Sequence, residues 1–314
     1  MDSRRVLAWG LPLLLVMAAA ALYLAIRPAD VRLAGTPTGP LIPTSGGELL
    51  GAPVGLANGE VVFLMVERGG WDSPQALFSV HGDDGELDRM SYWDWEMECP
   101  NYYTLERIAG RGGDGILAAA YCHGEGMVVD LLNPAHTSME RWGGFDAVAS
   151  VSLADDGSGI LVAKPSGAAC LTLLRRSTGT WSEAASEPGS EVATGPRGAC
   201  RFDDSQPLFV GAVGTEGVYV VQGRTLWLTN GRQSLVEQDL PFEVIRGVAT
   251  IDGQRLAVSG RVGGRDGLWL YSFGGDAVRL RVVGRFGELS RVDGGVLTGQ
   301  SVGGGTRIVR IAVR

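Results

Sequence analysis

The sequence predicts an all-β fold made of repeated sheets, preceded by one hydrophobic N-terminal segment. Three observations carry this prediction. Short β-rich runs separated by Gly, Asp and Asn turns occur throughout residues 48–314, they repeat at about forty residues, and no amphipathic helical periodicity follows the first segment. With 314 residues, 45 % of them hydrophobic, the chain is long enough to bury a core of this size.

The N-terminal segment is expected to anchor the chain in a membrane. Residues 6–26 form an uncharged run, long enough for a helix to cross a hydrocarbon core of about 30 Å. A cleaved signal peptide, which would leave a secreted protein, is the alternative, but its apolar part usually has about 7–15 residues. Because Arg4 and Arg5 outweigh Arg27, residues 1–27 predict a single-pass signal anchor in the cell membrane, with the C-terminal domain outside the cytoplasm.

Residues 28–47 are predicted to be a Pro/Gly-rich linker that spaces the following domain from the bilayer. Four prolines, Pro28, Pro37, Pro40 and Pro43, stand among Gly, Thr and Ser, which is typical of an extended segment without a regular hydrogen-bond ladder.

The remaining sequence repeats in register. The run TLWLT at 225–229 returns as GLWLY at 267–271, and an Asp-Gly turn recurs before a strand, for example at 252–253 and 293–294. Repeats of about 40 residues with four strands each are typical of propeller blades. We therefore predict a six-bladed β-propeller over residues 48–314, with seven blades as the alternative. The expected blades are 48–90, 104–142, 146–184, 206–238, 243–282 and 284–314.

The last repeat contains only three clear strands. Its fourth strand could come from residues 31–41 in the linker, which would join the two ends of the chain and remove an open sheet edge.

This pattern resembles the WD-repeat-like and TolB-like bacterial β-propellers over most of residues 45–314. The resemblance implies the architecture and supplies no catalytic residues to carry over. In detail the sequence departs from the pattern, since the Trp-Asp strand endings and the Gly-His signature are absent. Propellers host binding proteins and enzymes alike, so the fold does not fix the function.

Four cysteines follow the anchor, in a compartment where disulfides form. Three pairings are possible, and the repeat favours Cys99–Cys122 and Cys170–Cys200. Each of these pairs would fasten an over-long connector, residues 91–103 or 185–205, to a strand of the adjacent repeat.

The net negative charge of the predicted exported domain limits the kinds of partner that it can bind. The formal net charge of the chain is −8, and without the N-terminal segment it is about −10. Nucleic acid and anionic lipid both require basic patches, so neither is expected as a partner, and the membrane is contacted through the N-terminal helix alone.

The connector SYWDWEMECPNYY at 91–103 is the candidate binding segment. Its aromatic rings offer broad contact surfaces of the kind found in protein hot spots and in sugar stacking, and its carboxylates can accept hydrogen bonds. An ordinary edge strand with alternating inward aromatics remains the other interpretation. The candidate binding residues, which include one histidine beside Cys122, are Tyr92, Trp93, Asp94, Trp95, Glu96, Tyr102, Tyr103 and His123.

The sequence contains no convincing catalytic or cofactor-binding motif. The G-x-S-x-G match at 299–303 leads into another strand with no downstream histidine, and the three histidines have no metal spacing. We therefore expect no metal, cofactor or catalytic residue. The expected function is a binding or scaffold module for an envelope protein or glycan, and the alternative is a carbohydrate-active hydrolase or lyase. A third possibility is an assembly subunit without a ligand of its own.

Overall fold

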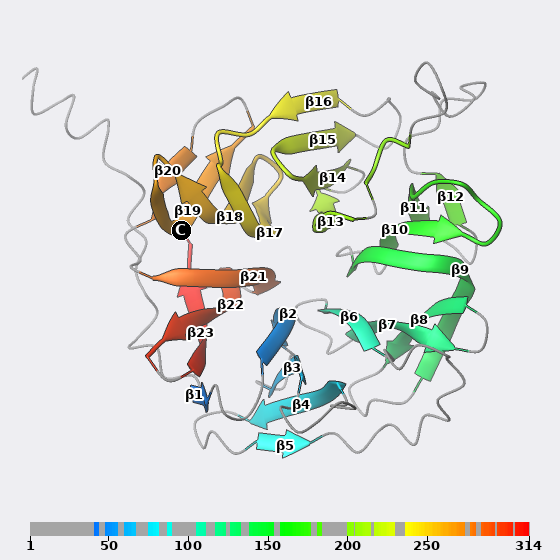
Figure 1. Cartoon of the computed structure of the whole chain (residues 1–314), viewed down its shortest axis with the longest axis horizontal. Coiled ribbons are helices and arrows are strands. Elements are labelled where there is room, and N and C mark those ends of the chain that lie inside the picture. The colour runs from blue at the N-terminus through cyan, green and yellow to red at the C-terminus, as the bar shows by residue number, and fades with distance from the viewer. Residues whose placement is uncertain are drawn as a thin grey trace, which may run out of the picture.

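Antiparallel β-sheets arranged in a ring make up the described part of this computed structural model (Figure 1). The structure describes residues 41–43, 48–55, 60–66, 75–81, 87–89, 105–110, 117–123, 126–132, 138–153, 158–176, 181–183, 200–203, 205–214, 217–229, 236–273, 277–280, 284–292, 294–303 and 305–313. None of these residues forms a helix long and apolar enough to cross a bilayer, and the predicted anchor at residues 6–26 lies outside them.

Four separate sheets contain four strands each. The first consists of β2 (Glu48–Gly55), β3 (Glu60–Val66), β4 (Gln75–His81) and β5 (Leu87–Arg89). The second consists of β13 (Leu208–Val213), β14 (Gly217–Gln222), β15 (Thr225–Thr229) and β16 (Val236–Asp239). The third consists of β17 (Val244–Asp252), β18 (Arg255–Val262), β19 (Arg265–Ser272) and β20 (Ala277–Arg279). The fourth consists of β21 (Arg285–Val292), β22 (Gly295–Val302), β23 (Gly305–Ala312) and β1 (Leu41–Pro43).

The remaining strands form one sheet of seven. Its strands are β6 (Leu105–Gly110), β7 (Leu117–His123), β8 (Gly126–Leu132), β9 (Ser138–Leu153), β10 (Gly159–Pro165), β11 (Thr172–Arg176) and β12 (Trp181–Glu183). The predicted boundary between two repeats, at residues 142–146, therefore falls inside the 16-residue strand β9. The first part of β9 pairs with β8 and the second part with β10.

Two glycines allow β9 to pass from one pairing to the other. Phe145 is paired with Met127 on β8 and also with Pro165 on β10. Gly144, next to it, has φ +88°, a left-handed conformation that glycine adopts without a Cβ penalty. A Cβ on Gly126 would lie 2.9 Å from the Phe145 carbonyl oxygen, so only glycine fits where the strand crosses.

The N-terminal strand β1 occupies the outermost place of the last sheet. Its residues pair with β23 in antiparallel register, with Leu41 opposite Arg307 and Pro43 opposite Gly305. We expected a closing strand from residues 31–41; the strand that the structure describes begins at the last residue of that stretch and continues to Pro43, and residues 31–40 lie outside the described residues. Strands from both ends of the chain thus share one sheet (Figure 1).

Most of the hydrophobic cores lie between neighbouring sheets, and one lies between the two parts of the seven-stranded sheet. One core joins β13–β16 to β17–β19 through Phe209, Tyr219, Phe242 and Trp269, and similar clusters follow around the ring. The innermost strands contact one another in the cyclic order β2, β6, β9, β13, β17, β21 and back to β2. Where the structure describes the side chains, neighbouring sheets cover one another's apolar faces, which removes apolar surface from water.

Candidate functional site

One face of the ring, which we call the connector face, is where the inner strands begin. Thr250 Oγ1, near the end of the inner strand β17, donates a 2.6 Å hydrogen bond to Ala212 O, near the end of the inner strand β13, so the C-terminal ends of these strands lie together. The inner strands β21 and β2 are aligned in the same way by the hydrogen bond from Ser290 Oγ to Pro53 O. Because strands within a sheet are antiparallel, the turns between second and third strands and the connections between sheets also lie at this face.

Both long connectors open at the connector face. The first leaves the end of β5 and returns at the start of β6, and the second leaves the end of β12 and returns at the start of β13. The predicted binding residues on the first connector, Tyr92, Trp93, Asp94, Trp95, Glu96, Tyr102 and Tyr103, lie outside the described residues. So does Cys99, and with it the predicted pairing of Cys99 with Cys122.

His123 is the one predicted binding residue on a described strand. It ends β7 and pairs with Gly126, while Leu105, the first described residue after the connector, pairs with Tyr121. The backbone therefore places His123 at the same face as the end of the aromatic connector. Its side chain is not among those that the structure describes.

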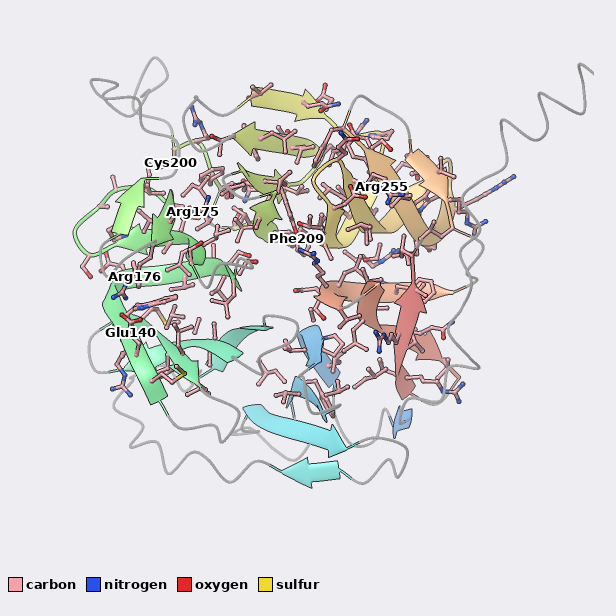
Figure 2. The ribbon with its side chains drawn as sticks, turned by 180° about the vertical axis from the view of Figure 1, so that it is seen from behind. Glu140, Arg175, Arg176, Cys200, Phe209 and Arg255 are labelled. Carbon is pink, nitrogen blue, oxygen red and sulfur yellow. A yellow bond between two sulfur atoms is a disulfide. The ribbon has the colours of Figure 1, made fainter. Side chains whose placement is uncertain are left out.

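The predicted disulfide Cys170–Cys200 is confirmed. It joins the turn after β10 to the segment before β13, with the two Cα atoms 5.3 Å apart. Figure 2 shows Cys200 between the seven-stranded sheet and the sheet of β13–β16. The second long connector is thus fastened at its C-terminal end to the connector face.

The segment after Cys200 is held in place by side-chain packing as well as by the disulfide. Phe202 is buried, and its ring meets Trp227 edge-on with centroids 5.4 Å apart. The Asp203 carboxylate accepts hydrogen bonds from the Ser205 amide at 2.9 Å and its hydroxyl at 2.6 Å, which lower the pKa of Asp203. Asp203 N also donates a 2.9 Å bond to the side chain of buried Gln222. This segment is therefore pre-ordered rather than dependent on a ligand for its shape.

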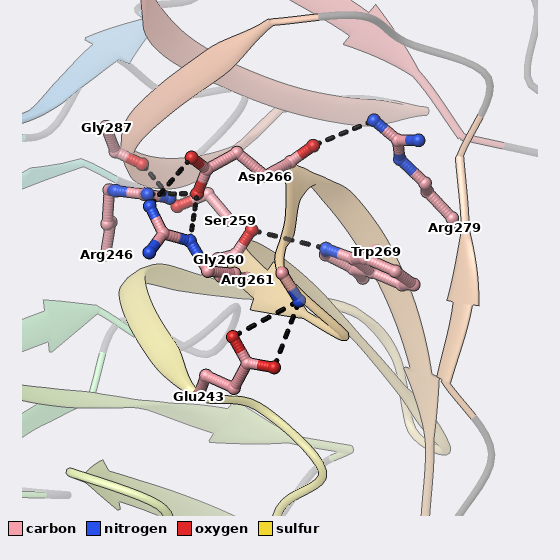
Figure 3. Close-up of polar contacts among 10 residues, drawn as sticks. Glu243, Arg246, Ser259, Gly260, Arg261, Asp266, Trp269, Arg279 and Gly287 are labelled. Atoms are coloured by element: carbon pink, nitrogen blue, oxygen red, sulfur yellow. Dashed lines mark hydrogen bonds and ion pairs between the residues drawn. The ribbon is translucent and has the colours of Figure 1, made fainter.

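A cluster of arginines surrounds Asp266 at the connector face (Figure 3). Arg261 on β18 lies directly opposite Asp266 on β19 and donates a 3.1 Å hydrogen bond from Nη2 to Oδ2. Arg246, on the inner strand β17, forms an ion pair with Oδ1 of the same carboxylate. Arg279 Nη2 donates a 2.8 Å bond to the Asp266 main-chain oxygen, and its guanidinium lies 6.0 Å from the Trp269 ring centroid.

Hydrogen bonds from Arg261 and Arg246 lower the pKa of Asp266 to about 2. The carboxylate is therefore ionised at any physiological pH and holds both guanidinium groups in place. Beside this cluster, Glu243 accepts hydrogen bonds from the Gly264 amide at 3.1 and 3.3 Å. That contact fixes the turn between β18 and β19.

A second charged cluster, partly buried, lies on the seven-stranded sheet. The Asp130 carboxylate accepts bonds from Arg141 at 2.8 and 3.0 Å and from the Tyr121 hydroxyl at 2.5 Å. Burial and the contact with Asp130 raise the pKa of Tyr121, so its hydroxyl stays protonated and acts as a donor. All three groups are partnered with one another, which fits a structural role in the sheet.

Away from the centre of the ring, Arg176 and Glu140 form an ion pair on the outer part of the seven-stranded sheet (Figure 2). The Arg176 guanidinium also lies 5.1 Å from the Trp142 ring centroid. Among the described residues, no three His, Cys, Asp or Glu side chains are grouped so that they could hold a metal ion.

The sequence interpretation missed the arginine cluster. Part of the signal was present, because Arg261 and Asp266 flank the Gly263-Gly264 turn and a hairpin there places them opposite each other. The contribution of Arg246 could not be read locally, since its contact with Asp266 depends on how β17 packs beside the hairpin.

Comparison with solved structures shows the fold. A protein described as a putative gluconolactonase matches with 16% identity over 91% of this chain and 95% of that chain, at a TM-score of 0.54. The β-propeller domain of the Trilobed protease from Pyrococcus furiosus matches at 11% identity over 85% and 84%, with a TM-score of 0.47. The β-propeller domain of Swd1 from Myceliophteria thermophila matches at 12% identity over 91% and 100%, with a TM-score of 0.44.

The ring of antiparallel sheets and the match at a TM-score of 0.54 show that this chain is a β-propeller, which confirms at the level of the fold the resemblance stated from the sequence. No protein-family model and no curated protein matches the sequence. The structural neighbours carry the names of unrelated activities, so they leave the function to be argued from this chain's own residues.

Proposed function

We propose that this protein is a membrane-anchored, extracytoplasmic β-propeller that binds an envelope protein or glycan as a binding or scaffold module. The observation that carries this proposal is the organisation of the connector face. Two long connectors open there, and one of them is fastened by the Cys170–Cys200 disulfide and by the burial of Phe202. Ordering a surface before binding lowers the entropy lost when a partner docks.

The disulfide also supports the proposed location. Structural disulfides persist in oxidising compartments and are rare in the cytosol. An exported domain held by a helix at residues 1–27 is the simplest arrangement that combines the apolar N-terminal run with a cross-linked connector.

The finer architecture that we propose is six blades. The seven-stranded sheet would then be two blades that share β9, one containing β6–β8 and the other β10–β12. In support, the two parts pack against each other as neighbouring sheets do: Val129 and Trp142 share one core with Leu161 and Leu174. Six inner strands also contact one another in succession around the ring.

The aromatic connector would be the main contact surface. Tryptophan and tyrosine supply large contact areas and lose little side-chain entropy, which is why they dominate binding hot spots. The variant Trp93→Ala/Trp95→Ala should lose capture of the envelope partner in crosslinking and pulldown experiments, while its melting temperature stays unchanged.

A matched control is Met139→Ala/Val236→Ala. These residues are 58% and 60% exposed and lie near the start of the outer, first part of β9 and near the start of the outer strand β16, at the face opposite the connector face. The control should bind normally. A folded Trp93→Ala/Trp95→Ala variant with undiminished capture would remove the aromatic connector from the proposal, and new reducing ends released from a polysaccharide would favour the enzymatic alternative.

A further inference from the structure

One sector of the connector face carries an excess of arginine. It is formed by β17–β23, where the described residues near this face include six arginines and three carboxylates, although the chain as a whole has a net charge of −8. We call it the arginine sector. Its arginines are Arg246, Arg261, Arg265, Arg279, Arg285 and Arg307, and its carboxylates are Glu243, Asp266 and Glu288.

Part of the arginine sector is rigidly held. Two guanidinium groups, those of Arg246 and Arg261, share the single Asp266 carboxylate, so the group of three keeps one positive charge. Arg246 Nη1 is buried and has no hydrogen-bond partner among the described residues. Arg279, which donates to the Asp266 main-chain oxygen, and Glu243, whose charge acts on Arg261, extend the cluster to three arginines and two carboxylates, which together keep one positive charge.

The rest of the arginine sector faces solvent. Arg265 follows the turn between β18 and β19, Arg285 begins β21, and both are exposed. The Arg261 side chain is 42% exposed although it contacts Asp266. The two sheets are joined closely here, since Ser259 Oγ donates a 2.5 Å hydrogen bond to Gly287 O. Exposed guanidinium groups from both sheets thus stand beside a fixed positive cluster.

We propose that the arginine sector docks an acidic polypeptide segment of the protein partner. This inference rests on the proposed binding function and specifies the chemistry of its ligand. Guanidinium groups match carboxylates in bidentate geometry, and an exposed cluster of them on an acidic protein selects for a segment of opposite charge.

The placement of the arginines favours a polypeptide over an acidic glycan. They come from five different strands, β17, β18, β19, β20 and β21, with a sixth on β23, and they follow no common spacing. Glutamate and aspartate carry each carboxylate on its own rotatable side chain and can adapt to such irregular positions. The carboxylates of a polyuronate are fixed on rigid rings at a regular repeat.

The test uses the variant Arg265→Ala/Arg285→Ala, with Arg291→Ala/Arg310→Ala as its control. The control changes the net charge equally and alters two exposed arginines on β21 and β23 at the opposite face. Binding of a fluorescent peptide of alternating glutamate and serine is measured by anisotropy, with a glutamine-serine peptide and polygalacturonate as the other probes. Measurements are made at ionic strengths of about 0.01 M and about 0.15 M, over which the Debye length falls from about 30 Å to about 8 Å.

The inference predicts that the wild-type protein binds the glutamate peptide and not the glutamine peptide, with affinity that falls as salt rises. Arg265→Ala/Arg285→Ala should weaken binding about tenfold, and the control by less than about twofold. Equal losses in both variants, or no binding of the glutamate peptide, would overturn it. If the protein binds polygalacturonate and not the glutamate peptide, the ligand of the arginine sector is an acidic glycan and the inferred polypeptide ligand is wrong. If Arg265→Ala/Arg285→Ala still captures the envelope partner normally, the inference fails while the proposed function stands.

Discussion

Removal of the Cys170–Cys200 disulfide should destabilise the propeller by a predictable amount. The two cysteines are 30 residues apart, and in the chain-entropy model a closed loop of this length stabilises the fold by about 3.5 kcal/mol. With a urea dependence of about 3 kcal/mol per M, Cys170→Ala/Cys200→Ala should lower the unfolding midpoint by about 1 M.

The assay is urea unfolding followed by circular dichroism, with and without reductant. The sequence contains two further cysteines, so reductant alone would not isolate this bond. The double variant removes this bond selectively. Any remaining effect of reductant on the unfolding midpoint of that variant would come from a disulfide formed by Cys99 and Cys122. An unchanged midpoint in the double variant would refute the claim that this disulfide fastens the connector.

Three further predictions test the surroundings of the connector face. Because hydrogen bonds lower the pKa of Asp266 to about 2, it contributes stability above its unfolded pKa of about 4 and loses that contribution as pH falls from about 4 to about 2. Asp266→Asn should therefore show a smaller loss of stability over this range in urea unfolding, and an identical pH profile would contradict the contact. Gly247→Ala should cost about 1–3 kcal/mol, since its Cβ would lie 2.5 Å from the backbone of β21. Gly253→Ala, whose Cβ meets nothing within 4 Å, is the control, and equal melting temperatures for the two variants would count against the close approach of the sheets. Ile42 and Thr306 are cross-strand partners, so Ile42→Cys/Thr306→Cys should form a disulfide and raise the melting temperature; two free thiols in the folded variant would argue against closure by β1.

The sequence predicted the repeating sheets because their signals are local. The runs at 225–229 and 267–271 fall in β15 and β19, which both hold third place in their sheets. The pairing of Cys170 with Cys200 followed from the same repeat, since the over-long connector at 185–205 contains one cysteine and the adjacent repeat contains the other.

The interruption expected near residues 142–146 shows where local signals fail. Gly143 and Gly144 resemble a turn, yet β9 continues through them because its two parts pair with different strands. The arginine cluster depends likewise on packing between β17 and the hairpin of β18 and β19, which no short stretch of sequence specifies.

The central claim, that partners dock on the connector face, is tested most directly by site-specific photocrosslinking of the full chain in cells. Arg224 lies in the turn after β14 at the connector face, and Gln254 lies in the turn after β17 at the opposite face; both are exposed. A photoreactive residue at position 224 should give the partner adduct that is lost in Trp93→Ala/Trp95→Ala, and the same residue at position 254 should give none. An adduct from position 254 with none from position 224 would contradict the account.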